Sequence, residues 1–206
     1  MNTPQVHVSG SVYSRILWTY GLYTLLFNAV FLISFYWLPE GFLRESPLTT
    51  SGQVVAEAQT FWGQLALTLL FNLGLVSGFG IIMNFIQVKG ISLGYLYPLF
   101  AAIFTGLITG TNSFVSSDMT QFNVRDGMAL SLSIGNLELL GYFFIVASSV
   151  RVGIYQYIRF WQWAPIKVMK LRDVRFAKPE IICLVIGILL VIFGAYRETL
   201  MSFNML

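Results

Sequence analysis

Few residues in this sequence are of a type that can do chemistry, and the carboxylate Glu138 is the first of them. It lies inside the apolar stretch from Gly127 to Gly153, which is long enough to cross a bilayer. A charge at the centre of a membrane helix costs about 2.5 to 3.5 kcal/mol even on a lenient insertion scale. Glu138 must therefore face protein, water or a bound partner.

Two asparagines are the candidate companions of Glu138. Asn72 lies 11 residues past Phe61, and Glu138 lies 11 residues past Gly127, so both are expected roughly 16 Å deep from the same side of the membrane. Asn136 belongs to the same candidate polar site. Three roles stay open for this site: a polar contact between helices, a proton or solute site, or a groove for a partner protein.

The sequence lacks the residue patterns that most kinds of catalytic site require. The single histidine, His7, lies outside the apolar runs, which excludes a His-x-x-x-His zinc site within the membrane. There is no glycine-rich phosphate loop with Lys and Ser or Thr, and no Gly-x-Ser-x-Gly motif. We therefore expect no enzyme activity, no cofactor and no metal ion.

The composition places the chain in a membrane. Of its 206 residues, 56% are hydrophobic and 10% are charged, whereas soluble proteins have about 25% charged residues. The one cysteine, Cys183, excludes an intrachain disulfide. These values predict one all-α domain over residues 1–206, a polytopic integral membrane protein with five transmembrane helices.

Five apolar runs are expected to cross the bilayer. They cover residues 16–38, 61–86, 91–114, 128–150 and 181–200. Pro39 ends the first run, and Pro98 is expected to kink the third. Residues 40–60 read as a loop with a short helix at Val54 to Gln59.

The distribution of positive charge predicts the orientation. With five crossings, nine of the twelve Lys and Arg residues fall on the side of the amino terminus and three on the other side. Cytoplasmic loops carry the excess of Lys and Arg in membrane proteins. The amino terminus is therefore expected inside and the carboxyl terminus outside, in a multi-pass protein of the cell inner (cytoplasmic) membrane.

Two pairs of glycines have the spacing of a helix contact. Gly74 and Gly78 lie on one face of the second run, and Gly106 and Gly110 lie on one face of the third. Small residues four apart allow another helix to approach closely. The alternative is that these glycines are ordinary content of membrane helices.

The segment from Arg151 to Glu180 holds seven of the twelve positive charges. Trp161 and Trp163 stand where an aromatic belt would meet the membrane surface. The cations that would bind anionic lipid headgroups or a partner protein are Arg159, Lys167, Lys170, Arg172, Arg175 and Lys178. Alternatively, the charges only fix the orientation. At the outer end of the last run, Arg197 and Glu198 are each expected to pair with a different neighbour.

The chain resembles the stage II sporulation protein M family of membrane proteins in a set of short motifs. These are Asn72 in the second run, Gly90 and Gly94 in KGISLG, Glu138 in GNLELLGYF, and Glu198 in YRETL. The resemblance covers roughly residues 61–203. Ile134 and Lys89 replace the His and the Asn that are often found in the family pattern, so the chain resembles a divergent member.

The resemblance implies a non-catalytic polytopic scaffold that recruits or anchors partner proteins, as in cell-wall remodelling. The expected partners are the lipid bilayer and other membrane or membrane-associated proteins. A homo-oligomer is compatible with this role, and no nucleic-acid partner is expected. The alternative function is a permease-like subunit of an ABC-type or other transport system that moves a solute or proton past Glu138.

Overall fold

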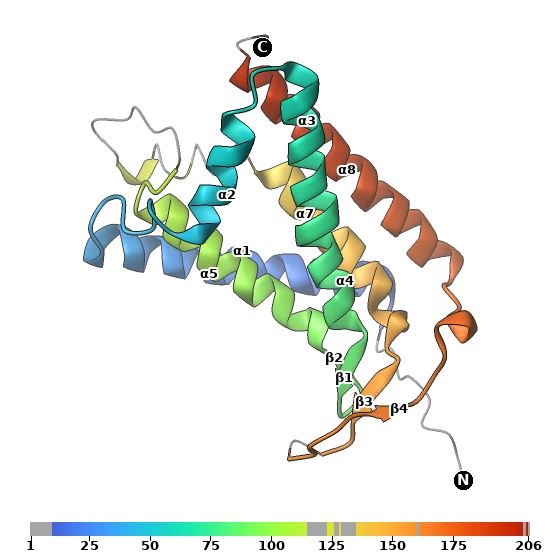
Figure 1. The fold of residues 1–206 in the computed structure, drawn as a ribbon. Coiled ribbons are helices and arrows are strands. Elements are labelled where there is room, and N and C mark those ends of the chain that lie inside the picture. Colours follow the sequence, from blue (N-terminus) through green and yellow to red (C-terminus); the bar gives the residue numbers. More distant parts are fainter. Residues whose placement is uncertain are drawn as a thin grey trace.

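The structure of this chain, a computed structural model, is mostly helical (Figure 1). It describes residues 10–114, 123–125, 128, 135–159, 161–203 and 205. Four helices of this part are long and apolar enough to cross a membrane: Val12–Trp37, Phe61–Asn84, Leu93–Gly110 and Lys178–Ser202. They coincide with four of the five predicted spans, so the helical membrane class is confirmed at this level.

The four long helices are built from the labelled elements of Figure 1. The first is α1 (Val12–Trp37) and the last is α8 (Lys178–Ser202). The second joins α3 (Phe61–Leu69), a π-helical segment (Leu70–Ser77) and α4 (Gly78–Asn84). The third joins a 3-10 turn (Leu93–Leu96) to α5 (Tyr97–Gly110). The separate helix α2 (Pro47–Ala56) lies in the loop between the first two.

The predicted span at residues 128–150 corresponds to α7 (Asn136–Ser148). Its 13 residues extend about 20 Å, which is less than the roughly 30 Å of a hydrocarbon core. Residues 129–134, where the predicted span begins, lie outside the described part. The fifth crossing therefore stays a prediction.

Two local expectations are wrong. Pro98 does not kink a helix, because α5 begins at Tyr97 and the proline occupies its first turn, where a missing N–H costs nothing. The short helix of the first loop begins at Pro47 instead of Val54, because the Ser46 hydroxyl accepts a hydrogen bond from the Thr49 N–H and caps it.

The all-α expectation missed a small four-stranded sheet with the order β2-β1-β3-β4. Strands β1 (Ile86–Val88) and β2 (Ile91–Ser92) form a hairpin. Its two turn residues, Lys89 and Gly90, both have positive φ, as a two-residue hairpin turn requires. β1 pairs in parallel with β3 (Tyr155–Tyr157), and β3 pairs antiparallel with β4 (Ile166–Lys167).

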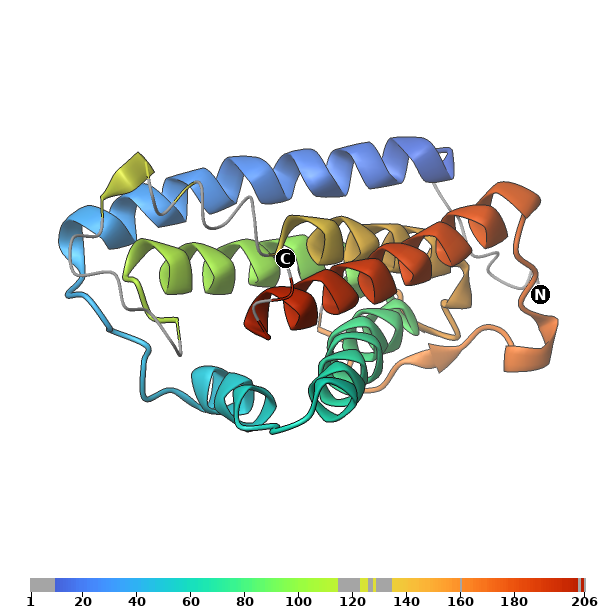
Figure 2. The same ribbon diagram turned by 90° about the horizontal axis from the view of Figure 1, so that it is seen from above.

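Helix α7 is the centre of the molecule. It packs along α8 and also contacts α1 and α4 (Figures 1 and 2). The core joins aromatic side chains of α1 to α7, and its fully or almost fully buried members include Tyr23, Phe27, Phe31, Phe143 and Val146. By contrast, Leu17 and Trp18 on the other face of α1 are 72% and 76% exposed, as side chains that contact lipid would be.

Hydrogen bonds join the segments at each end of the helices. At the end that carries the sheet, β1 and β3 are paired, and Arg15 at the start of α1 bonds to Glu180 at the start of α8. At the opposite end, the Gly41 N–H donates to the Thr111 carbonyl oxygen at 2.6 Å. The segments after α1 and after α5 therefore lie together, far from the sheet (Figure 1).

Candidate functional site

The structure brings Asn72 and Glu138 together. Asn72 Nδ2 donates a hydrogen bond of 2.8 Å to Glu138 Oε1. Glu138 lies in the first turn of α7, where the helix dipole favours a negative charge. Its side chain is 8% exposed, so the carboxyl is held by protein. This contact was within reach of the sequence, because both residues had been placed at the same depth.

Asn72 lies in the π-helical segment, whose wider turns interrupt the regular helix between α3 and α4. The Ser77 hydroxyl donates to the Asn72 carbonyl oxygen at 2.8 Å and satisfies it within the segment. Short π-helical segments occur often at functional sites of membrane and soluble helices. Here the segment places an amide donor against the only carboxylate of α7.

A second carboxyl group, Glu198 of α8, lies one turn after Gly194, the α8 residue that faces Glu138. Tyr142 is buried one turn further along α7. Gly194 makes room for this arrangement, because a Cβ at this position would overlap Glu138 Cγ. The cluster of Asn72, Glu138 and Glu198 is therefore a polar centre between α7, α8 and the π-helical segment.

Asn136 and Arg197 lie at the edges of this centre. Asn136 Oδ1 accepts a long hydrogen bond of 3.4 Å from the Tyr20 hydroxyl of α1. Arg197 is half-buried on α8 next to Glu198. Asn136 thus connects α7 to α1, whereas Asn72 connects it to the second long helix.

The two predicted glycine pairs have different surroundings. Gly106 and Gly110 lie against α1: a Cβ on Gly106 would be 2.9 Å from Val30, and one on Gly110 would be 2.7 Å from the Phe31 carbonyl oxygen. Among the described residues, only atoms of their own helix lie within 4 Å of a Cβ added at Gly74 or Gly78, so a helix contact at this pair stays a prediction. Both glycines lie in or next to the π-helical segment.

The closest helix contacts within the second half of the chain are made by glycines that the sequence reading missed. Gly141 of α7 faces Gly187 and Val191 of α8, and Gly194 faces Glu138. Gly187 and Gly194 are seven residues apart and hence on one face of a helix. That spacing was the available signal, because small residues mark close helix contacts in membranes.

The most strongly bonded charged cluster, Arg15, Arg151 and Glu180, was also missed. Arg15 Nη2 lies 2.6 Å from Glu180 Oε1, and Arg151 Nε lies 2.7 Å from Oε1 and 2.6 Å from Oε2. The Ala177 N–H donates to Oε2 at 2.8 Å. Arg15 and Glu180 are buried, whereas the Arg151 side chain is 42% exposed. Arg151 therefore pairs with Glu180 as well as reaching the surface.

The predicted basic segment forms the outer part of the sheet and the chain that leads to α8. Trp161 and Trp163 are 93% and 101% exposed. The exposed cations are Arg159, Lys167, Lys170, Arg172, Arg175 and Lys178. Among these six exposed cations, only Arg172 has an ion pair within the described part of the chain, a loose one to Asp173 at 3.7 Å. The segment thus presents two indole rings and several cations to its surroundings.

Within the part of the chain that the structure describes, no group of three His, Cys, Asp or Glu residues is placed to hold a metal ion. Cys183 is buried as a free thiol. Comparison with protein families, curated proteins and solved structures finds no match to this chain. The resemblance to the sporulation protein therefore stays a prediction, and the function is argued from the residues.

Proposed function

We propose that this chain is a non-catalytic integral membrane scaffold that anchors partner proteins at the cytoplasmic face of the inner membrane. Five crossings, with the sheet inside and the carboxyl terminus outside, are part of this proposal. The observation that supports it is the exposed surface of Trp161 and Trp163, in the connection between β3 and β4, together with the neighbouring cations. A sheet fixed to two membrane helices holds such a surface in one orientation.

The polar groups of the interior support the same proposal. Asn84 Nδ2 donates to the Val146 carbonyl oxygen and to Ser149 Oγ, both at 2.8 Å, and Asn84 Oδ1 accepts from Ser92. This network joins the end of α4, the start of the third long helix and the end of α7. A buried, bonded amide of this kind stabilises one arrangement of helices. A fixed arrangement of helices is suited to a protein that anchors partner proteins.

A photo-reactive amino acid at position 163 tests the scaffold proposal in native membranes. We expect one discrete cross-linked protein partner at this position. The matched control carries the same group at Leu25, which is 69% exposed on the apolar face of α1 and should cross-link lipid. Replacing Lys167, Lys170 and Arg172 by Gln should lower the yield at position 163. Cross-links to lipid alone at both positions would contradict the proposal.

The polar centre favours a second candidate function, a permease-like subunit that moves a proton or solute past Glu138. The supporting observation is that the buried Glu138 accepts a hydrogen bond from the Asn72 amide and lies against Gly194, one turn of α8 before a second carboxyl group, Glu198. In proteoliposomes with a pH gradient, Glu138→Gln should abolish proton flux while leaving assembly intact. Glu57→Gln, at an exposed carboxylate, is the control. Equal flux in wild type and Glu138→Gln would exclude this function.

A further inference from the structure

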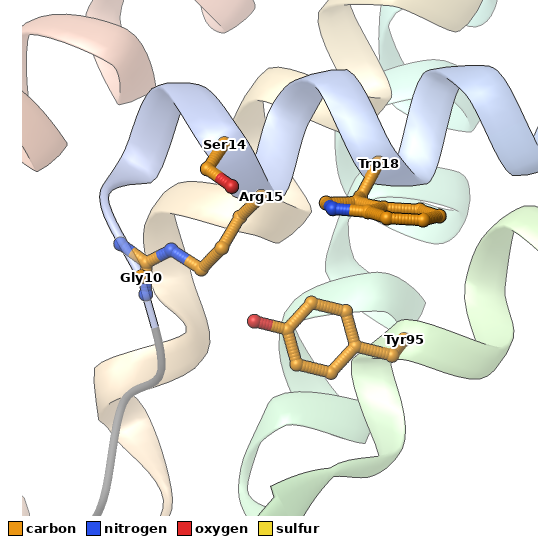
Figure 3. A pocket seen from close by; sticks show the side chains of 5 residues that line it. All are labelled: Gly10, Ser14, Arg15, Trp18 and Tyr95. Atoms are coloured by element: carbon orange, nitrogen blue, oxygen red, sulfur yellow. The ribbon is translucent and has the colours of Figure 1, made fainter.

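A hollow of about 310 Å³ lies at the start of α1, next to the Arg15–Glu180 pair. Its lining residues are Gly10, Ser14, Arg15, Trp18 and Tyr95 (Figure 3). The first four come from α1 and the residue that precedes its cap, and Tyr95 comes from the turn before α5. The Ser14 and Tyr95 hydroxyls lie on either side of the Arg15 side chain, whose guanidinium extends toward Gly10 (Figure 3).

Arg15 has donors that nothing in the described chain satisfies. Its side chain is 4% exposed, its Nη2 donates to Glu180, and the Tyr95 hydroxyl lies close to its guanidinium. Nε and Nη1 are buried and have no hydrogen-bond partner among the described residues. A buried charged donor without an acceptor costs about 1 to 3 kcal/mol or more. Such donors in a native fold call for an acceptor that the described residues do not supply.

The local charge balance shows which kind of acceptor fits. Arg15 and Arg151 share a single carboxylate, Glu180, and both of its oxygens already accept hydrogen bonds from Arg151 and from Arg15 or the Ala177 N–H. One positive charge is therefore left over beside the hollow. The amino end of α1 adds a partial positive charge of about half a unit. The occupant is accordingly an anion with several acceptor oxygens.

We propose that this hollow binds a phosphate group and that a phospholipid headgroup supplies it. A guanidinium donates charge-assisted hydrogen bonds to phosphate oxygens, and Arg15 Nε and Nη1, which point to different sides of the group, would each donate to a separate acceptor oxygen. The Ser14 and Tyr95 hydroxyls can donate to the remaining oxygens. Trp18, 76% exposed at the rim, and the neighbouring exposed Leu17 offer an indole and an apolar surface to the glycerol and acyl parts of a lipid.

This inference does not depend on the scaffold proposal, because it uses none of the residues of the sheet. The test uses the full chain, stripped of lipid in a maltoside detergent that carries no phosphate. Short-chain phosphatidylglycerol and, in parallel, inorganic phosphate are added, and binding is followed by the rise in Tm and by native mass spectrometry. We expect saturable binding of the lipid, with a higher Tm, at lower concentrations than those needed for inorganic phosphate.

Variants of the lining residues locate the site. Arg15→Gln should weaken lipid binding at least about tenfold, because hydrogen bonds to charged groups are the strong ones. The double variant Ser14→Ala with Tyr95→Phe removes two hydroxyls and should weaken binding about 3- to 10-fold. It leaves the Arg15–Glu180 pair in place, so it stays informative if Arg15→Gln does not fold. The matched control, Arg172→Gln, removes an exposed guanidinium outside the hollow and should bind like wild type.

Each outcome decides the proposal. Lipid affinity that is the same in wild type and in the double variant overturns it, as does the absence of any saturable binding. If inorganic phosphate binds as tightly as the lipid and shows the same dependence on Ser14 and Tyr95, the hollow is a phosphate site. The proposal that a lipid supplies the phosphate is then wrong. Loss of binding in the double variant and not in Arg172→Gln supports the site as proposed.

Discussion

Gly141 of α7 and Gly187 of α8 face each other across a close helix contact. A Cβ on Gly141 would lie 2.7 Å from the Gly187 carbonyl oxygen, and one on Gly187 would lie 2.8 Å from the Gly141 carbonyl oxygen. Neither distance is possible for a real side chain. In a membrane, close backbone approach replaces the hydrophobic effect as a source of helix association.

Gly141→Ala should therefore destabilise the chain, because the added methyl group forces α7 and α8 apart. We expect a loss of about 1 to 3 kcal/mol, as for overpacking of other well-packed interiors. The measurement is unfolding in detergent followed by circular dichroism. Gly74→Ala is the matched control: only Leu70 of its own helix lies near the added atom, so its effect should be small. Equal losses for the two variants would contradict this contact.

The bond between Asn72 and Glu138 should contribute about 1 kcal/mol, as inter-helix polar contacts in membranes do. A double-mutant cycle of Asn72→Ala and Glu138→Ala measures it from the unfolding free energies. Asn28→Ala is the control, because the Asn28 amide bonds only to the Thr24 carbonyl oxygen of its own helix. A coupling energy of zero would mean that the two side chains do not stabilise each other.

Glu180→Gln should be far more costly than the loss of a surface charge. It leaves the Arg15 and Arg151 guanidinium groups side by side without a counter-charge, and breaking a buried ion pair costs about 3 to 5 kcal/mol. Asp173→Asn, which removes the partner of Arg172 in an exposed pair at 3.7 Å, should cost less than about 1 kcal/mol. Urea unfolding in mixed micelles compares them. Similar midpoints for the two variants would refute the importance of the buried cluster.

The predicted orientation can be tested with a thiol reagent that does not cross membranes. In a Cys183→Ala background, Lys170→Cys should be labelled only from the cytoplasmic side, because it lies at the sheet end of the helices. Glu45→Cys, in the loop after α1, should be labelled only from the outer side. Labelling of both positions from the same side of the membrane would contradict the five-crossing arrangement.

The sequence predicted the four long helices correctly, because the hydropathy of a span is averaged over many residues. It also reached the pairing of Asn72 with Glu138, because helical rise converts sequence position into depth. It missed the Arg15–Glu180 pair, whose members are 165 residues apart and lie at the first turns of two helices. In the sequence, charges at helix ends are interpreted as signals of membrane orientation. Only their proximity in three dimensions shows that they form an ion pair.

The sheet was beyond reach for a different reason. Its strands contain two or three residues each, which is too short for the alternation that marks a strand. The pairing of Gln87 with Gln156 depends on where α4 and α7 end, and no local pattern encodes that. The role of Gly94 is similarly non-local, because a Cβ there would overlap the Asn84 amide.

The parallel ladder between β1 and β3 constrains how the chain is assembled. Its two strands leave different helices and are synthesised almost 70 residues apart, yet they must emerge into the same aqueous compartment to meet. In the proposed five-crossing arrangement, α4 and α7 would have to insert with their strand ends on the same side of the bilayer for β1 and β3 to pair. A chain in which one of these helices inserted the wrong way round could not form the ladder.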